Sequence, residues 1–314
     1  MIPVIDLNPL WQGPDGLEKI AGQLEEIYST IGFAQVINHQ IPPETIRALY
    51  QASHDFHQLP DHEKQALRFK HCLRGFIPLN ASTLVKSQLG QAKLPNQSES
   101  FMVLSDLPKE HKWYSSKLGG QQIWPAQLPE FTSQVQRYAA ALRALGHRLM
   151  HAFTLAMHVP ADTLDHCFTQ PLNSLRLLRY PPRPADASPE LYGSAPHTDY
   201  GCLTLLHQDA SGGLQVQLPD TSWIDVAPME DALVLNTGQM MEIWSNGRLR
   251  ATRHRVINKG SGFRYSMPFF YDCNIDAQIA PLAGCITPDN PPRYPAVIYG
   301  DNLEKLLSAN YQFE

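Results

Sequence analysis

Apolar positions at helical spacing dominate the middle of the chain. Between Phe131 and Val159, apolar side chains recur three and four residues apart, as Val135, Tyr138 and Leu142 illustrate. This period lines them up along one face of an α-helix, and a helix with one apolar face packs that face against a core. The pattern therefore predicts one long supporting helix over residues 131–159.

The N-terminal third mixes strand patterns with helix patterns. Apolar runs at 2–7 and 33–37 predict short buried strands, separated by a helix over 16–30. A second helix is expected over 42–60, because proline is tolerated in the first turn of a helix and stops one further on. Residues 78–98 are polar with little periodicity, which is typical of a surface loop or a mobile lid. We expect an α/β region here.

After residue 171 the pattern changes to short apolar stretches broken by Gly, Pro, Asn and Asp, with no helix expected before 302–309. The candidate strands lie at 174–180, 202–207, 213–218, 222–226, 232–236, 241–244, 251–257 and 263–271. Strands of this length and spacing fit an antiparallel sandwich or a jelly roll. The fold class expected is therefore mainly β, with flanking helices.

Composition narrows the class of protein. The 314 residues include 25 Lys and Arg against 30 Asp and Glu, a net charge of −5, and neither sign forms a long run, which argues against nucleic acid as a partner. Five cysteines lie far apart and indicate reduced thiols rather than disulfides. No secretory leader and no apolar run of about 18 residues is seen. We expect a cytoplasmic protein without a membrane partner.

A candidate metal site begins at His197-Thr-Asp199. Residues two apart in an extended segment project from the same side, so both side chains can reach one ion. His254 is the natural third ligand. Two His and one carboxylate on one face of an octahedron are the signature of iron(II) sites that activate oxygen, and they leave three positions for a bidentate 2-oxo acid and O2.

Other interpretations of these histidines remain open. The chain has 13 histidines, and a His-x-Asp triplet by itself also occurs in surface turns. His147 and His151, four apart in the predicted long helix, could share a metal, but no carboxylate stands beside them in sequence. We take that segment as a packing helix.

A second set of residues fits a carboxylate. Arg264 and Ser266 lie on one face of a predicted strand, and a guanidinium fork plus a hydroxyl is a natural receptor for a carboxylate. If 260–262 is a three-residue hairpin loop, Ser266 faces Val256 and lies about 7 Å along the sheet from His254, close to the length of a five-carbon diacid. The spacing predicts a 2-oxoglutarate anchor.

A surface salt bridge is the alternative role for Arg264. The apolar run at 267–270 argues for a semi-buried strand, where an unpaired guanidinium is costly. Arg264 therefore needs an anionic partner, and no acidic residue lies next to it in the sequence.

Nearly the whole chain resembles the 2-oxoglutarate- and iron(II)-dependent oxygenases of the isopenicillin N synthase-like group. The motifs that carry the resemblance, in family order, are Ile2-Pro-Val-Ile-Asp-Leu, Gly32-Phe-Ala-Gln-Val-Ile-Asn-His39, Arg74-Gly75-Phe76, Trp124-Pro125, Leu177-Leu-Arg-Tyr-Pro-Pro182, His197-Thr-Asp199, Gly212-Gly-Leu-Gln-Val216, Asn236-Thr-Gly238, Ser245-Asn-Gly247, His254-Arg-Val256 and Arg264-Tyr-Ser266. So many motifs in one order make coincidence an inadequate explanation.

The resemblance implies a double-stranded β-helix with iron at its mouth and a contact between Tyr180 and the 2-oxoglutarate carboxylate. It implies four segments: an N-terminal α/β region of non-haem dioxygenase type at 1–115, a linker with the long helix at 116–170, a jelly-roll core at 171–280 and a C-terminal extension at 281–314.

Three positions depart from the family pattern. Gln40 stands where Gly is usual, Leu178 where Asn is frequent and Gln239 where Asp is common. None of them touches the predicted metal ligands or the Arg-Ser pair. Leu178 and the nearby Arg176 leave open how the inner carboxylate of 2-oxoglutarate is held.

The activity implied is oxidation, chiefly hydroxylation, of a small organic substrate with Fe(II), 2-oxoglutarate and O2, releasing succinate and CO2. One alternative is an iron oxidase of the same fold that uses no 2-oxo acid and catalyses desaturation or ring closure. Another is a non-catalytic ligand-binding jelly roll. We expect a monomer or a weak homo-oligomer. The aromatic and apolar residues Phe76, Phe101, Met102 and Phe269 are candidates for an apolar substrate pocket or for ordinary core.

Overall fold

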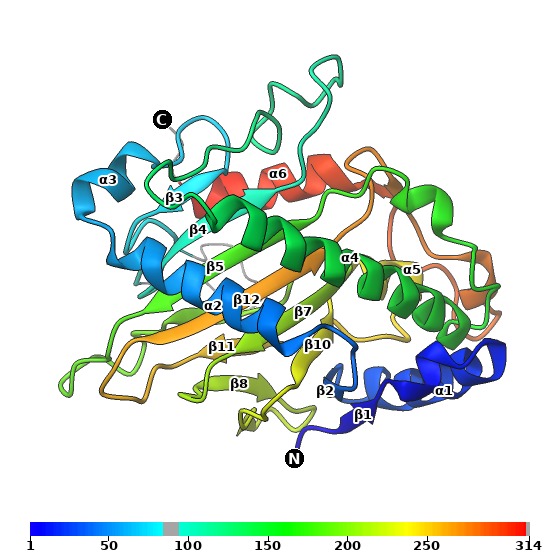
Figure 1. Ribbon diagram of the computed structural model, residues 1–314. Coiled ribbons are helices and arrows are strands. Elements are labelled where there is room, and N and C mark those ends of the chain that lie inside the picture. The colour runs from blue at the N-terminus through cyan, green and yellow to red at the C-terminus, as the bar shows by residue number, and fades with distance from the viewer. Residues whose placement is uncertain (84–93, 312–314) are drawn as a thin grey trace.

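The computed structural model describes residues 1–83 and 94–311. Two β-sheets face each other at the centre (Figure 1). The strands of the larger sheet, in spatial order, are β1 (Val4–Asp6), β2 (Phe33–Ile37), β10 (Leu233–Thr237), β7 (Leu203–Gln208), β12 (Arg264–Tyr271), β5 (Ser174–Tyr180), β4 (Glu99–Leu104) and β3 (Gly75–Ile77). The strands of the smaller sheet are β6 (Ser194–His197), β11 (His254–Val256), β8 (Leu214–Gln217) and β9 (Trp223–Asp225).

The inner faces of the two sheets bury a small apolar core. Leu178 and Val234 of the larger sheet pack in one cluster with Leu214, Val216 and Val256 of the smaller sheet. Burial of these alternating residues holds the sheets together and leaves a space between them toward β6 and β11. The jelly-roll core expected from the sequence is confirmed.

Helices cover the outer face of the larger sheet (Figure 1). They are α1 (Pro14–Tyr28), α2 (Pro43–Gln58) and α4 (Phe131–Ala156). The predicted long helix is α4, whose residues Val135, Tyr138 and Leu142 are buried. It stops three residues earlier than expected, and His158 just beyond it has a φ of 61°, a conformation that cannot continue a helix. These helices cover much of the outer face, and the inner face borders the space between the two sheets.

The remaining elements are short. They are α3 (Asp61–Ala66), α5 (Gln239–Trp244), α6 (Tyr299–Asn310), the 3-10 helices η1 (Asn8–Trp11), η2 (Asp165–Phe168) and η3 (Ala283–Cys285), and the strand pair β13 (Gln278–Ile279) and β14 (Val297–Ile298). No helix in the described residues has both the length and the apolar character needed to cross a bilayer.

One strand prediction was wrong, and one strand was not predicted. Residues 241–244 belong to α5, whose Met240, Met241 and Trp244 are buried, so a helix does occur before the C-terminal one. A short apolar run does not distinguish a buried helix turn from a buried strand. The strand that takes its place in the jelly roll is β6, at 194–197, where Ala195 and Pro196 show little alternation.

The predicted hairpin between 251–257 and 263–271 was also wrong. β11 pairs with β6 and β8, whereas β12 pairs with β5 and β7 in the other sheet. The connection crosses between the sheets, and the side-chain amide of Asn258 holds it by donating to the carbonyl oxygens of Tyr180, Pro181 and Gly262. His254 and Ser266 therefore approach each other across the core rather than along one sheet.

The predicted surface loop at 78–98 is partly packed. Residues 84–93 lie outside the described residues, but Ser82, Asn96 and Ser98 on either side are buried. At both edges of the larger sheet, strands of the N-terminal third (β1 with β2, and β3 with β4) continue the strands of the core. The four segment boundaries expected from the sequence stay predictions.

Candidate active site

The three predicted metal ligands lie together at the mouth of the space between the sheets. His197 ends β6, Asp199 follows two residues later, and His254 begins β11 directly opposite His197. The Nε2 atoms of His197 and His254 lie 3.7 and 3.5 Å from Oδ1 of Asp199. The imidazole centroids are 4.3 Å apart. Three donor atoms therefore face one point.

Backbone carbonyls orient both imidazoles. Nδ1 of His197 lies 2.8 Å from the carbonyl oxygen of Ala195, and Nδ1 of His254 lies 3.1 Å from that of Thr252. Because a carbonyl only accepts, each Nδ1 carries the hydrogen and each Nε2 keeps its lone pair. Histidines that bind metals are commonly oriented in this way, by a hydrogen bond from the ring nitrogen that faces away from the ion.

Two residues of the larger sheet fix the carboxylate of Asp199. Thr204 Oγ1 donates to Oδ2 of Asp199 over 2.5 Å, and Asn236 Nδ2 donates to the same oxygen over 2.6 Å. Oδ1 is left facing the histidines. The sequence analysis did not identify Thr204, and it named Asn236 only as part of a motif. The two residues come together because they pair on the neighbouring strands β7 and β10.

The pKa shifts of His197 and Asp199 suit a metal, whereas that of His254 favours its protonated form, whose Nε2 proton a bound metal ion would replace. Burial, together with the neighbouring His254, lowers the pKa of His197 to about 4 and so favours its neutral form. Burial works to raise the pKa of Asp199, but His254, His197 and Thr204 outweigh it and hold the pKa below its usual value. Burial also opposes the charge on His254, yet Asp199 and the Thr252 carbonyl raise its pKa. Two imidazole nitrogens and an anionic oxygen, oriented by other groups, fit a divalent iron ion.

The other candidate pair, His147 and His151, lies close to a carboxylate in the structure. Asp165 of η2 comes within 2.8 Å of His151 Nε2, and His147 lies one turn away on α4. Sequence reasoning found no carboxylate here because Asp165 is distant along the chain. The cluster is on the surface, and its aspartate is already paired with His151.

Arg264 is fully buried at the inner face of β12, opposite Tyr180. Its Nε donates to the carbonyl oxygen of Gly212 over 2.5 Å, and Nη2 donates to Oε1 of Gln208 over 3.3 Å. Nη1 is buried without a hydrogen-bond partner, and no carboxylate among the described residues pairs with this guanidinium. A buried cation left in this state is costly, so the site fits an anionic ligand that is not part of the chain.

Ser266 and Tyr180 lie beside this guanidinium. Ser266 Oγ is 3.5 Å from the Tyr180 hydroxyl, and the Tyr180 ring lies 4.8 Å from the guanidinium carbon of Arg264. All three residues line one cavity, here called the inter-sheet cavity, together with Asp199 and His254. The cavity thus joins an unsatisfied cation and two hydroxyls to the three metal-type donors, which is the layout that a chelating diacid requires.

Comparisons with known proteins agree with this layout. Residues 171–272 match the 2OG-Fe(II) oxygenase superfamily, and residues 2–127 match the family described as the non-haem dioxygenase in morphine synthesis N-terminal. A 2-oxoglutarate-dependent dioxygenase of Aspergillus niger, caaD, is 35% identical over 88% of this chain and 85% of its own. The 2-oxoglutarate-Fe(II) type oxidoreductase hxnY of Emericella nidulans is 32% identical over 98% of this chain and 90% of its own.

Solved structures give the same result. The crystal structure of a full-length Neurospora crassa protein in complex with α-ketoglutarate superposes with a TM-score of 0.86 at 27% identity, covering 98% of this chain and 96% of that one. A putative 2OG-Fe(II) oxygenase of Caulobacter crescentus superposes with a TM-score of 0.84 at 28% identity, covering 98% of both chains.

The chain therefore belongs to the 2-oxoglutarate- and Fe(II)-dependent oxygenase superfamily. It is an oxidoreductase of the dioxygenase class, with Fe(II), 2-oxoglutarate and O2 as its cofactor and cosubstrates.

Proposed function

We propose that His197, Asp199 and His254 hold the Fe(II) of this dioxygenase, and that Arg264, Ser266 and Tyr180 bind its 2-oxoglutarate. The reaction proposed is hydroxylation of a small organic substrate. The observation that carries the proposal is the inter-sheet cavity, which connects three oriented metal donors to a buried guanidinium with an unpartnered Nη1.

The chain's own residues position the reactants. Arg264 and Ser266 fix the distal carboxylate of 2-oxoglutarate, so that its other end faces the donor atoms of His197 and Asp199. Thr204 and Asn236 keep Asp199 aimed at the same point. Bound Fe(II) with 2-oxoglutarate supplies O2 activation, coupled to release of succinate and CO2.

The fold alone also accommodates an oxidase that needs no 2-oxo acid. The buried Nη1 of Arg264 favours the 2-oxoglutarate reaction, because without a dianion this cation stays uncompensated. Structures of the Neurospora crassa neighbour contain thymine or 5-formyluracil, which supports a small organic molecule as the substrate class. From the sequence we further expect a cytoplasmic protein that is a monomer or a weak homo-oligomer.

The test is anaerobic titration of the Fe(II)-loaded protein with 2-oxoglutarate. The parent should develop a visible charge-transfer band, and Asp199→Ala should lose both iron and band. His151→Ala is the matched control, since it removes a histidine from the surface cluster and should keep the band. A folded parent without the band contradicts the assignment, and substrate oxidation without succinate formation favours the oxidase.

A further inference from the structure

A second cavity adjoins the inter-sheet cavity on the far side of the metal-type donors. Both cavities are lined by Arg176, His197 and Asp199, but the second one leaves out Tyr180, Arg264 and Ser266 and extends instead to α6. A molecule in the second cavity therefore reaches the predicted iron without displacing 2-oxoglutarate. This is the space available for the substrate.

The walls of the second cavity are largely apolar. The apolar side chains that line it include Leu73, Met102, Leu104, Leu172, Leu303 and Leu307. Of the four residues that the sequence suggested for an apolar substrate pocket, only Met102 lines this cavity. Phe76, Phe101 and Phe269 are buried in the main core. An apolar body is thus the part of a ligand that these walls stabilise.

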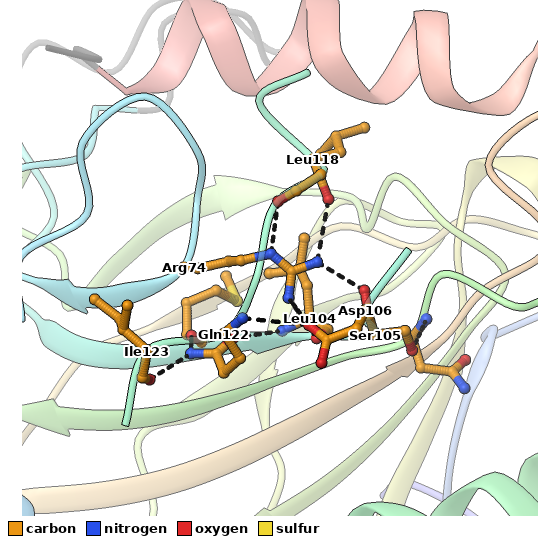
Figure 2. Close-up of polar contacts among 10 residues, drawn as sticks. Arg74, Leu104, Ser105, Asp106, Leu118, Gln122 and Ile123 are labelled. Atoms are coloured by element: carbon orange, nitrogen blue, oxygen red, sulfur yellow. Dashed lines mark hydrogen bonds and ion pairs between the residues drawn. The ribbon is translucent and has the colours of Figure 1, made fainter. Parts of the chain in front are cut away.

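Arg74 holds one wall in place (Figure 2). This buried guanidinium donates to the carbonyl oxygens of Gly119, Leu104 and Ser105 over 2.7, 2.8 and 2.7 Å, and Nη1 also lies 3.0 Å from Asp106 Oδ1. It ties the end of β4, which carries Leu104, to the segment that carries Leu118, so this part of the cavity wall is held in place before a ligand binds.

Arg176 is the cationic group in this apolar setting. It lies on the inner face of β5, and its Nε donates to Ser100 Oγ over 2.8 Å. Its Nη2 is buried without a hydrogen-bond partner, and no described carboxylate forms an ion pair with it. By contrast, Arg179 on the outer face of the same strand is ion-paired with Glu99.

The two acids that line the second cavity are already engaged. Asp199 accepts hydrogen bonds from Thr204 and Asn236. Asp272 accepts the backbone N–H of Cys202 over 2.6 Å, and burial raises its pKa to about 7, which reduces its negative charge at neutral pH. Neither carboxylate compensates Arg176, so its charge is left for a ligand.

We propose that the substrate of this oxygenase is a small acid with an apolar body, and that its carboxylate binds the guanidinium of Arg176. This inference rests on the proposed function, because the second cavity is the substrate cavity only if the metal lies at its inner end. The apolar walls hold the body, and the Arg176 contact sets which carbon faces the oxidising centre.

The test compares carboxylic acids with their primary amides, which have nearly the same shape but no charge. Octanoate, cinnamate and naphthoate are titrated against the metal-free protein by calorimetry, each beside its amide, and then against the Fe(II)- and 2-oxoglutarate-loaded protein while the visible band is followed. At least one acid should bind about 10- to 100-fold more tightly than its amide, the range expected for a charge-assisted contact.

Arg176→Gln should abolish that preference and change the affinity for 2-oxoglutarate less than about threefold. Arg179→Gln, the same substitution on the outer face, should keep the preference. The proposal is overturned if no acid binds more tightly than its amide, if Arg176→Gln keeps the preference, or if this variant loses 2-oxoglutarate affinity instead. If only the visible band of the Fe(II)- and 2-oxoglutarate-loaded protein is missing, the metal assignment is wrong. The calorimetric comparison of acids with amides on the metal-free protein then still tests the role of Arg176.

Discussion

Replacing Arg264 with Gln gives the most direct test of the 2-oxoglutarate anchor. In the structure, Nε and Nη2 of Arg264 are occupied by Gly212 and Gln208, and Nη1 is the buried donor left over. A hydrogen bond to a charged group contributes about 1.5–3 kcal/mol. At about 1.4 kcal/mol per tenfold change, Arg264→Gln should raise the Kd for 2-oxoglutarate by about 10- to 150-fold.

The assay is anaerobic titration of the Fe(II)-loaded protein with 2-oxoglutarate and, separately, with 2-oxopentanoate. The second ligand has the same chelating end but no distal carboxylate. If Arg264 grips the distal carboxylate, the parent should prefer 2-oxoglutarate by about the same factor, and the variant should lose that preference while binding 2-oxopentanoate as the parent does.

Arg179→Gln is the matched control for this substitution. Arg179 lies across from Tyr265 on the outer face of the larger sheet, and its partner Glu99 keeps Lys64 as a second cation at 3.2 Å. The Arg179→Gln variant should bind 2-oxoglutarate with the same affinity as the parent. Equal weakening of both 2-oxo acids by Arg264→Gln, in a folded protein, would refute the reasoning, because the loss would then concern the chelating end.

Three further outcomes are expected. Asn236→Ala removes a 2.6 Å hydrogen bond to Asp199 and should weaken iron binding by about 10- to 100-fold, measured by metal competition; unchanged affinity would contradict the supporting role. Burial raises the pKa of Asp272 from 3.8 to about 7, so the folded state favours the protonated carboxyl. The resulting stabilisation is fully present below about pH 3.8 and is lost as the pH rises through about 7. In denaturant unfolding, the unfolding free energy of Asp272→Asn relative to the parent should therefore increase by up to about 1.4 kcal/mol per pH unit between the two pKa values. Parallel pH profiles of the two proteins would show that Asp272 is ionised over this whole range. Gly201→Ala would put a Cβ 1.8 Å from Asp272 Oδ1 and should cost about 1–3 kcal/mol of unfolding free energy. Gly22→Ala, in the interior of α1 with open space around it, should instead stabilise the protein by about 0.5–1 kcal/mol. A Gly201→Ala variant as stable as the parent would show that the Asp272 side chain moves aside at no cost.

The chain's local periodicities were sufficient for a large part of the fold and the site. The period of 3.6 located α4, and the short alternating stretches located most strands of the jelly roll. The period of two placed His197 with Asp199 and Arg264 with Ser266, each pair on one side of its segment. These relations depend only on backbone dihedral angles within a few residues, so a single sequence contains them.

Tertiary structure decided how these segments meet. Only strand pairing sets Thr204 opposite Asn236 beneath Asp199, and only the crossover at Asn258 puts β11 and β12 in different sheets. The unpartnered Nη2 of Arg176 is likewise invisible in sequence, because whether a cation finds a carboxylate depends on every strand and loop packed around it. Long-range pairing is selected by the burial of whole faces, and that energy is shared among residues far apart in the chain.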